Sequence, residues 1–117
     1  MKEITMVTGN NGKWKIASDI FKKRNILLFQ ERIETPEIQA YNVEDVSAFS
    51  AIYAARKLGK SVIKSDVGYF IKSLKGFPGP FVKYINGMLT SEEILELMKE
   101  KKDRTIILRE CLTYATP

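Results

Sequence analysis

The first residues that could do chemistry form a turn of small residues ending in a lysine, Thr8-Gly9-Asn10-Asn11-Gly12-Lys13. The turn follows an apolar run and precedes a pattern typical of a helix. Small residues let backbone N–H groups face outward, a helix start carries partial positive charge, and Lys13 adds a full one. The turn is neither a Walker A loop nor a G-x-G-x-x-G loop. These residues therefore leave two alternatives, a loop that binds phosphate and a plain turn with an exposed lysine.

Two carboxylates lie outside the helical patterns. Asp66 follows an apolar run that reads as a strand, and catalytic residues of α/β sheets gather at the carboxyl ends of strands. Glu37 follows Pro36 in an irregular link. Two such carboxylates, brought together by the fold, can hold one Mg²⁺. The alternative is that both simply face water.

A third segment, Gly76-Phe77-Pro78-Gly79-Pro80-Phe81-Val82-Lys83-Tyr84, combines two glycines and two prolines with a following lysine. Glycine and proline restrict the backbone to a specific path, and Pro80 suits the first position of a helix. Lys83 is then expected one turn into that helix. The segment either delivers Lys83 to a site or forms a purely structural corner.

Composition narrows the chemistry that is open to the chain. Its 117 residues include no histidine, which excludes Ser-His-Asp and Cys-His catalysis and leaves oxygen ligands for a metal such as Mg²⁺, Mn²⁺ or Ca²⁺. The single cysteine, Cys111, can form no internal disulfide, which favours a reducing, cytoplasmic compartment. Neither a signal peptide nor a membrane span is predicted. The net charge of +5 suits either an anionic ligand or a lysine-rich soluble surface.

Apolar patterns and capping residues predict the elements that must position these side chains. Strands are expected at residues 3–8, 26–30, 61–65, 69–74 and 104–114. Helices are expected at residues 13–23, from Asn42 to about residue 58, after Pro80, and from Thr90 to about residue 102. The stretch 104–114 reads as an interior strand close to the end of the chain. Because strands alternate with helices, the predicted class is α/β, in one domain over residues 1–117.

Together these motifs resemble the inosine triphosphate pyrophosphatase family, whose members remove deaminated purine nucleotides. Four segments carry the resemblance, in the same order as in the family: Thr8-Gly9-Asn10…Lys13, Pro36-Glu37-Ile38-Gln39, Ser65-Asp66-Val67-Gly68 and residues 74–84. The last of them, L-x-G-F-P-G-P-[FY]-[VI]-K-[WY], is the most specific. The resemblance extends from Met1 to about Tyr114 and implies a mixed central sheet flanked by helices.

The resemblance also implies a reaction. Members of that family cleave a nucleoside triphosphate between its α and β phosphates and release pyrophosphate. It implies that Glu37 and Asp66 handle Mg²⁺, or Mn²⁺ in its place, and that Asp66 and Lys13 are catalytic. The nucleotide and its phosphates would be bound by Thr8, Gly9, Asn10, Lys13 and Lys83. Phosphoryl transfer needs charge neutralisation and an aligned nucleophile, and this set can supply both.

The chain departs from the family pattern at the expected site. Ser65-Asp66 stands where the family carries a pair of acids, and Val67 replaces a serine or threonine. A lysine common on the second helix has no match, because the plausible positions hold Ser50, Ala51 and Ala54. Each change removes charge or a polar contact, which should weaken the binding of Mg²⁺ and triphosphate.

The family's C-terminal portion, with F-G-[WY]-D-P and Ser-His-Arg segments that contact the base, has no counterpart in these 117 residues. The chain is therefore expected to be a C-terminally shortened form. Its last strand should have an exposed edge, for which pairing with a second subunit is predicted, in keeping with the homodimer expected of the family.

Three functions follow from these patterns. Ranked first is a Mg²⁺-dependent hydrolase acting on inosine, deoxyinosine and xanthosine triphosphates. Second is a degenerate member that binds nucleotide or a partner without turnover. Well below both stands a basic nucleic-acid-binding domain, since the chain shows no RRM, KH or zinc signature.

Overall fold

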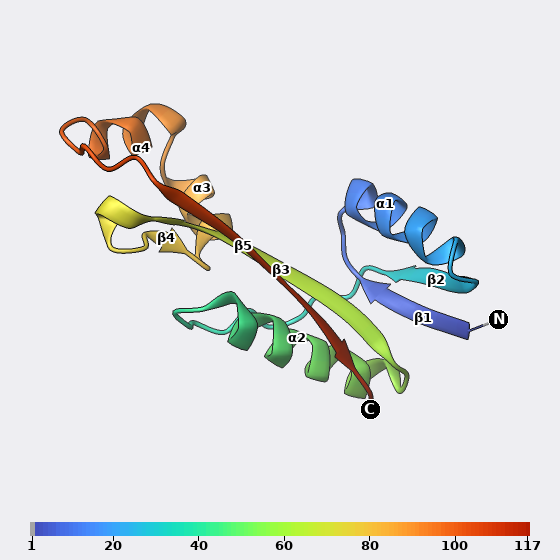
Figure 1. The fold of residues 1–117 in the computed structure, drawn as a ribbon. Helices are drawn as coiled ribbons and strands as arrows, with labels where there is room; N and C mark the ends of the chain where they lie inside the picture. The colour runs from blue at the N-terminus through green and yellow to red at the C-terminus, as the bar shows by residue number, and fades with distance from the viewer. Residues whose placement is uncertain (1) are drawn as a thin grey trace. The chain divides into compact units, whose positions relative to one another are not determined.

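The computed structural model describes residues 2–117, which form two compact units. The first unit holds residues 2–38, Ser47–Ser65 and Leu112–Pro117, and the second holds Gln39–Val46 and Asp66–Cys111. The elements run in the order β1 (Lys2–Val7), α1 (Asn11–Lys22), β2 (Ile26–Glu31), α2 (Val43–Leu58), β3 (Val62–Ile71), the 3₁₀ turn η1 (Lys72–Leu74), β4 (Pro78–Gly79), α3 (Val82–Met88), α4 (Ser91–Leu97) and β5 (Ile106–Ala115) (Figure 1). The helix α2 and the strands β3 and β5 each pass from one unit into the other.

In the first unit, β1 lies between β2 and β3 and is parallel to both, with Val7 opposite Glu31 and Met6 opposite Ile63. Successive side chains of a strand point to opposite faces. Met6 accordingly packs with Leu28 and Ile63 beneath α1, whereas Val7 packs with the alanines of α2. The two helices therefore cover opposite faces of these strands (Figure 1).

In the second unit, the remainder of β3 pairs antiparallel with β4, with Tyr69 opposite Gly79. The two backbones approach closely, because a Cβ atom at Gly68 would lie 2.5 Å from the carbonyl oxygen of Gly79. Only glycine fits at residue 68 without a shift of the backbone. Farther along, Thr90 and Glu93 form the predicted capping box of α4, each side chain accepting the other's backbone N–H.

The last strand, β5, pairs with β3 and has two unlike faces. One face meets α2, where the hydroxyl groups of Thr113 and Ser47 hydrogen-bond at 2.7 Å and Ala115 joins the alanine cluster. The other face carries four exposed apolar side chains, here called the β5 stripe: Ile106, Leu108, Leu112 and Tyr114. Leu108 is 73% exposed. The expectation of an interior strand is therefore wrong for this face.

The structure confirms the α/β class and a mixed sheet, and it corrects three boundaries. The two strands expected at residues 61–65 and 69–74 are one continuous strand, Val62–Ile71, so Asp66 lies within β3 and not at its end. The helix α3 begins at Val82, with Phe81 and not Pro80 at its start. The helix α4 ends at Leu97, earlier than predicted. The single domain over residues 1–117 stays a prediction beside the two units.

None of the helices within residues 2–117 combines the length and the apolar character that crossing a membrane requires.

Candidate functional site

The turn between β1 and α1 is a tightly hydrogen-bonded loop. Asn10 is the N-cap of α1, and its side-chain oxygen accepts the backbone N–H of Lys13 at 2.9 Å. The backbone N–H of Asn10 donates in turn to the Thr8 hydroxyl at 3.1 Å. The first N–H groups of a helix have no acceptor within the helix, which makes this end of α1 suited to an anion. A Cβ atom built on Gly9 meets nothing within 4 Å, so the loop opens to solvent at that point.

Lys13 connects this loop to the third strand. Its ammonium Nζ donates to the hydroxyl oxygen of Ser65 in β3 at 2.9 Å. Both residues belong to the first unit and are half-buried. The structure thus brings together the motif that ends in Lys13 and the motif that begins with Ser65. Because a hydroxyl carries no charge, this contact leaves the positive charge of Lys13 unneutralised.

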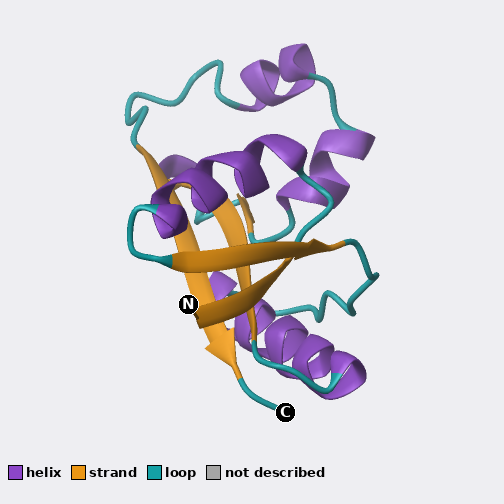
Figure 2. Ribbon diagram, turned by 90° about the vertical axis from the view of Figure 1, so that its right-hand side faces the viewer, coloured by secondary structure: helices purple, strands orange, loops and turns teal. Residues whose placement is uncertain are grey.

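Glu37 lies on the long irregular link between β2 and α2, which is drawn as a loop in Figure 2. The link is attached to α2 next to this carboxylate, since the fully buried Ser50 hydroxyl donates to the carbonyl oxygen of Pro36 at 2.8 Å. Ser50 is one of the plausible positions for the lysine that is common on the second helix of the family. In this chain its side chain instead holds the link in place.

Asp66 follows Ser65 directly in β3 and opens the second unit; its side chain is half-buried, and its Oδ2 atom is buried. Lys83 is the second residue of α3, also in the second unit, and is exposed. It lies within the first turn of that helix, not a full turn into it. Since Glu37 belongs to the first unit, the metal site that it was expected to form with Asp66 stays a prediction. No three histidine, cysteine or acidic side chains of residues 2–117 gather into a ready metal cluster.

Two residues that sequence reasoning missed hold the loop from the side of β2. Gln30 Nε2 donates to the carbonyl oxygen of Thr8 at 3.1 Å, and Arg32 Nη1 donates to that of Gly9 at 3.1 Å. Both side chains also donate to the side-chain oxygen of Asn11. The sequence did hold a signal for these two residues. Gln30 and Arg32 are two positions apart, so they share one face at the end of β2, and the carboxyl ends of parallel strands meet at one edge of a sheet.

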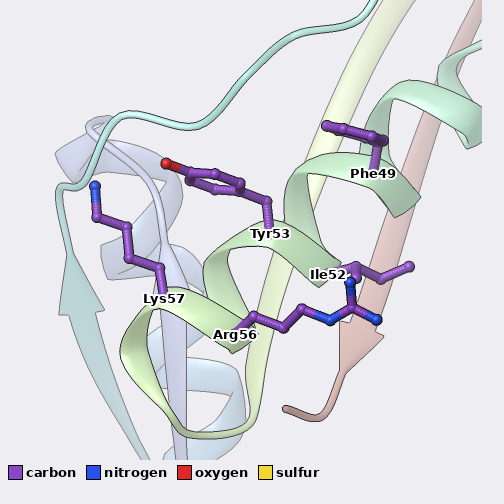
Figure 3. Close-up of a pocket in the computed structure, with 5 residues that line it drawn as sticks. All are labelled: Phe49, Ile52, Tyr53, Arg56 and Lys57. Atoms are coloured by element: carbon purple, nitrogen blue, oxygen red, sulfur yellow. The ribbon is translucent and has the colours of Figure 1, made fainter.

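A separate hollow of about 400 Å³ lies on the outer face of α2, lined by Phe49, Ile52, Tyr53, Arg56 and Lys57 (Figure 3). The Lys57 ammonium lies 5.8 Å from the centroid of the Tyr53 ring. The lining offers apolar and aromatic surface with two cations, and it contains no carboxylate. It therefore cannot supply the oxygen ligands that Mg²⁺ requires, and the loop of Thr8–Lys13 is the better candidate for phosphate chemistry.

Comparison with known proteins shows the family of the chain. A family model described as the Ham1 family matches residues 4–117. The dITP/XTP pyrophosphatase of Methanosarcina acetivorans is 37% identical over 117 residues, which are 100% of this chain and 64% of that protein. The chain thus spans less than two thirds of the length of this relative.

Two solved structures share the fold. The Ham1 protein of Staphylococcus aureus superposes with a TM-score of 0.81 at 22% identity, over 99% of this chain and 64% of that one. A HAM1 protein from Coxiella burnetii superposes with a TM-score of 0.83 at 19% identity, over 97% of this chain and 63% of that one. At these identities the likeness establishes the fold, a mixed sheet flanked by helices.

Proposed function

The chain belongs to the Ham1 family, and on that premise we propose that it hydrolyses deaminated purine nucleoside triphosphates to the monophosphate and pyrophosphate. The proposed substrates are inosine, deoxyinosine and xanthosine triphosphates. A relative that is 37% identical is named a dITP/XTP pyrophosphatase, and this chain spans 64% of its length.

One observation carries the proposal: the capped loop at the start of α1 includes a lysine, Lys13, whose ammonium bonds to Ser65 of β3. Thr8, Gly9 and Asn10 form a small-residue loop at the start of α1, and Lys13 holds its ammonium 2.9 Å from Ser65. Backbone N–H groups and a fixed cation stabilise the charge that develops on phosphate oxygens in the transition state. Lys13 acts in this way as a catalytic cation, and Lys83 binds the nucleotide from α3.

The acidic residues fit a divalent cation by their chemistry. Carboxylates, phosphate oxygens and water are the ligands that Mg²⁺ and Mn²⁺ prefer, and Glu37 and Asp66 are the two carboxylates assigned to it. When bound, the cation neutralises part of the charge of the triphosphate. The Asp66 carboxylate orients the attacking water and accepts its proton. The water oxygen bonds to the α-phosphorus while the bond from that phosphorus to the bridging oxygen breaks, and pyrophosphate leaves.

A second candidate function is nucleotide binding without turnover. It is favoured by Ser65, which presents a hydroxyl to Lys13 at the position where an acid was expected. A site with one carboxylate fewer holds Mg²⁺ more weakly, because affinity follows the number of charged ligands. The loop would still attract a triphosphate in such a protein.

We also propose a homodimer in the cytoplasm. The exposed β5 stripe supports the first part, since monomers seldom leave a strand with several large apolar side chains uncovered. The lone cysteine supports the second. Nucleic acid remains the least favoured partner.

The test is release of pyrophosphate from inosine, xanthosine, adenosine and guanosine triphosphates with Mg²⁺. Asp66→Asn keeps the shape of the side chain and removes its charge, and Asp19→Asn, on the exposed surface of α1, is the matched control. Release from the deaminated nucleotides that Asp66→Asn abolishes and Asp19→Asn preserves supports the hydrolase. Binding of these nucleotides with no release supports the second candidate.

A further inference from the structure

Arg32 lies outside the Thr8–Lys13 loop that is proposed to bind phosphate, yet its side chain bonds to that loop. The proposed function gives Arg32 no role. Arg32 follows β2 directly and lies in the same unit as the loop. Its Nη1 donates to the carbonyl oxygen of Gly9 at 3.1 Å, while its Nη2 donates to the side-chain oxygen of Asn11. The planar guanidinium thus joins two points of the loop, one on either side of the N-cap residue Asn10.

These bonds determine which way the loop's peptide groups point. The C=O and N–H of one trans peptide point in opposite directions. Gln30 holds the Thr8 carbonyl toward β2, so the N–H of Gly9 points away from β2. Arg32 does the same for the Gly9 carbonyl, and the N–H of Asn10 is accordingly directed to the Thr8 hydroxyl at 3.1 Å. The loop then presents an N–H at Gly9, the residue that opens to solvent.

The charge of Arg32 is also available to the loop. Its two acceptors in the loop are a carbonyl and an amide oxygen, which are neutral, and Arg32 is exposed. Within residues 2–117, the Lys13 ammonium likewise donates to a neutral group, the Ser65 hydroxyl. Neither cation is neutralised by these contacts, so both add positive potential where an anion would sit.

We propose that Arg32 is a positioning residue of the phosphate loop, acting by its two-pronged contact with Gly9 and Asn11. This inference rests on the proposed function, because it assumes that the loop holds phosphate. A lysine at this position keeps the charge but offers a single compact ammonium, which does not reproduce the fixed fork of a guanidinium. Comparing arginine with lysine at residue 32 therefore separates the positioning role of the guanidinium from the effect of its charge.

The test uses Arg32→Gln, Arg32→Lys and the control Arg24→Gln, which removes the same charge from an exposed residue in the turn after α1. The probe is inorganic tripolyphosphate, and the signal is the fluorescence of Trp14, the single tryptophan, whose backbone N–H bonds to Asn10. We expect Arg32→Lys, which keeps the charge, to bind about fivefold more weakly, the loss typical of a charge-assisted hydrogen bond, and Arg32→Gln, which also loses the charge, to bind more weakly still. Arg24→Gln should bind like the unmodified chain.

A double-mutant cycle with Asn11→Ala examines the geometry directly. If Arg32 acts through Asn11, the two losses are not additive, and Arg32→Gln weakens binding less once Asn11 is alanine. Thermal unfolding of each variant checks that the fold is intact. Arg32→Lys binding like the unmodified chain would overturn the positioning role and leave a role for charge only.

The proposed function can fail separately. Tripolyphosphate binding that depends on Arg32, without pyrophosphate release from any nucleotide, would reject the hydrolase and keep the inference. If the chain hydrolyses nucleotides, Arg32→Gln should raise KM and also lower kcat, because the loop whose shape it holds is proposed to bind phosphate in the ground state and to stabilise the charge of the transition state. Absence of tripolyphosphate binding by the unmodified chain would overturn the inference, and the turnover assay would then report separately on the function.

Discussion

The ammonium of Lys13 donates a hydrogen bond to the hydroxyl of Ser65 at 2.9 Å, so the loop before α1 is connected to the middle of β3. The resemblance to pyrophosphatases implies a carboxylate at residue 65. The Ser65 hydroxyl still ties Lys13 to β3, but it does not supply the negative charge that a carboxylate at this position would have. This pair bears on both candidate functions, and the first prediction concerns it.

Ser65→Asp should have opposite effects on the two ligands of the site. A carboxylate beside Lys13 adds an oxygen ligand, so Mg²⁺ should bind more tightly, by about tenfold for one added charged ligand. The same carboxylate cancels part of the charge of Lys13, so tripolyphosphate without Mg²⁺ should bind more weakly. Calorimetric titrations with each ligand measure both effects. Ser65→Ala is the control without added charge, and equal effects of the two variants would contradict the prediction.

Asn10 is the N-cap of α1, and it is also proposed to form part of the anion site; the two roles can be separated. Asn10→Ala removes the acceptor for the Lys13 N–H and should lower the free energy of unfolding by about 1 kcal/mol. Asn10→Asp retains an acceptor and suits the positive end of a helix, so stability should be kept. Its negative charge should nevertheless weaken tripolyphosphate binding. Chemical denaturation and Trp14 fluorescence give the two readouts, and parallel losses in both variants would refute the separation.

Ser50 should affect the link that carries Glu37. Its buried hydroxyl donates to the Pro36 carbonyl at 2.8 Å, and Ser50→Ala removes that bond. The loss should cost about 1 kcal/mol of stability. Because the link is then less firmly held, the Mg²⁺ affinity should fall as well. Ser18→Ala on α1 is the control. An unchanged Mg²⁺ affinity in Ser50→Ala would contradict the prediction and show that the position of the link does not affect metal binding.

Gly68 should tolerate no side chain. Gly68→Ala places a methyl group 2.5 Å from the Gly79 carbonyl oxygen, and the backbone shift should cost about 1 to 3 kcal/mol. The control is Gly87→Ala in α3, where a Cβ atom meets nothing within 4 Å. This second change should raise stability by about 0.5 to 1 kcal/mol, since alanine favours helix. Thermal melts of the two variants should therefore move in opposite directions.

The β5 stripe should support self-association. Leu108 is 73% exposed, and Leu108→Lys places a charge on the stripe, which should shift the chain toward monomer. Leu95→Lys on α4, where Leu95 is 60% exposed, is the matched control and should leave the association unchanged. Sedimentation at several concentrations measures the equilibrium. A monomeric unmodified chain, or equal effects of both variants, would contradict the homodimer formed through this face.

The sequence by itself determined the family, the α/β class and the caps of two helices. Thr90 forms the predicted capping box of α4, and the Asn42 side chain accepts the backbone N–H of Asp45 at the start of α2, because capping depends on a few neighbouring residues. The resemblance that four short motifs carried is confirmed by the Ham1 family match over residues 4–117.

Sequence reasoning was wrong where long-range pairing prevails over local signals. Two separate strands were predicted at residues 61–65 and 69–74, yet β3 is continuous through Asp66 and pairs with β4 at Tyr69. Only the tertiary structure decided that Lys13 meets Ser65 and that Arg32 bonds to Gly9. Those contacts depend on the parallel pairing of β1 with β2 and β3, which joins residues far apart in the chain, and no local pattern records which strands become neighbours.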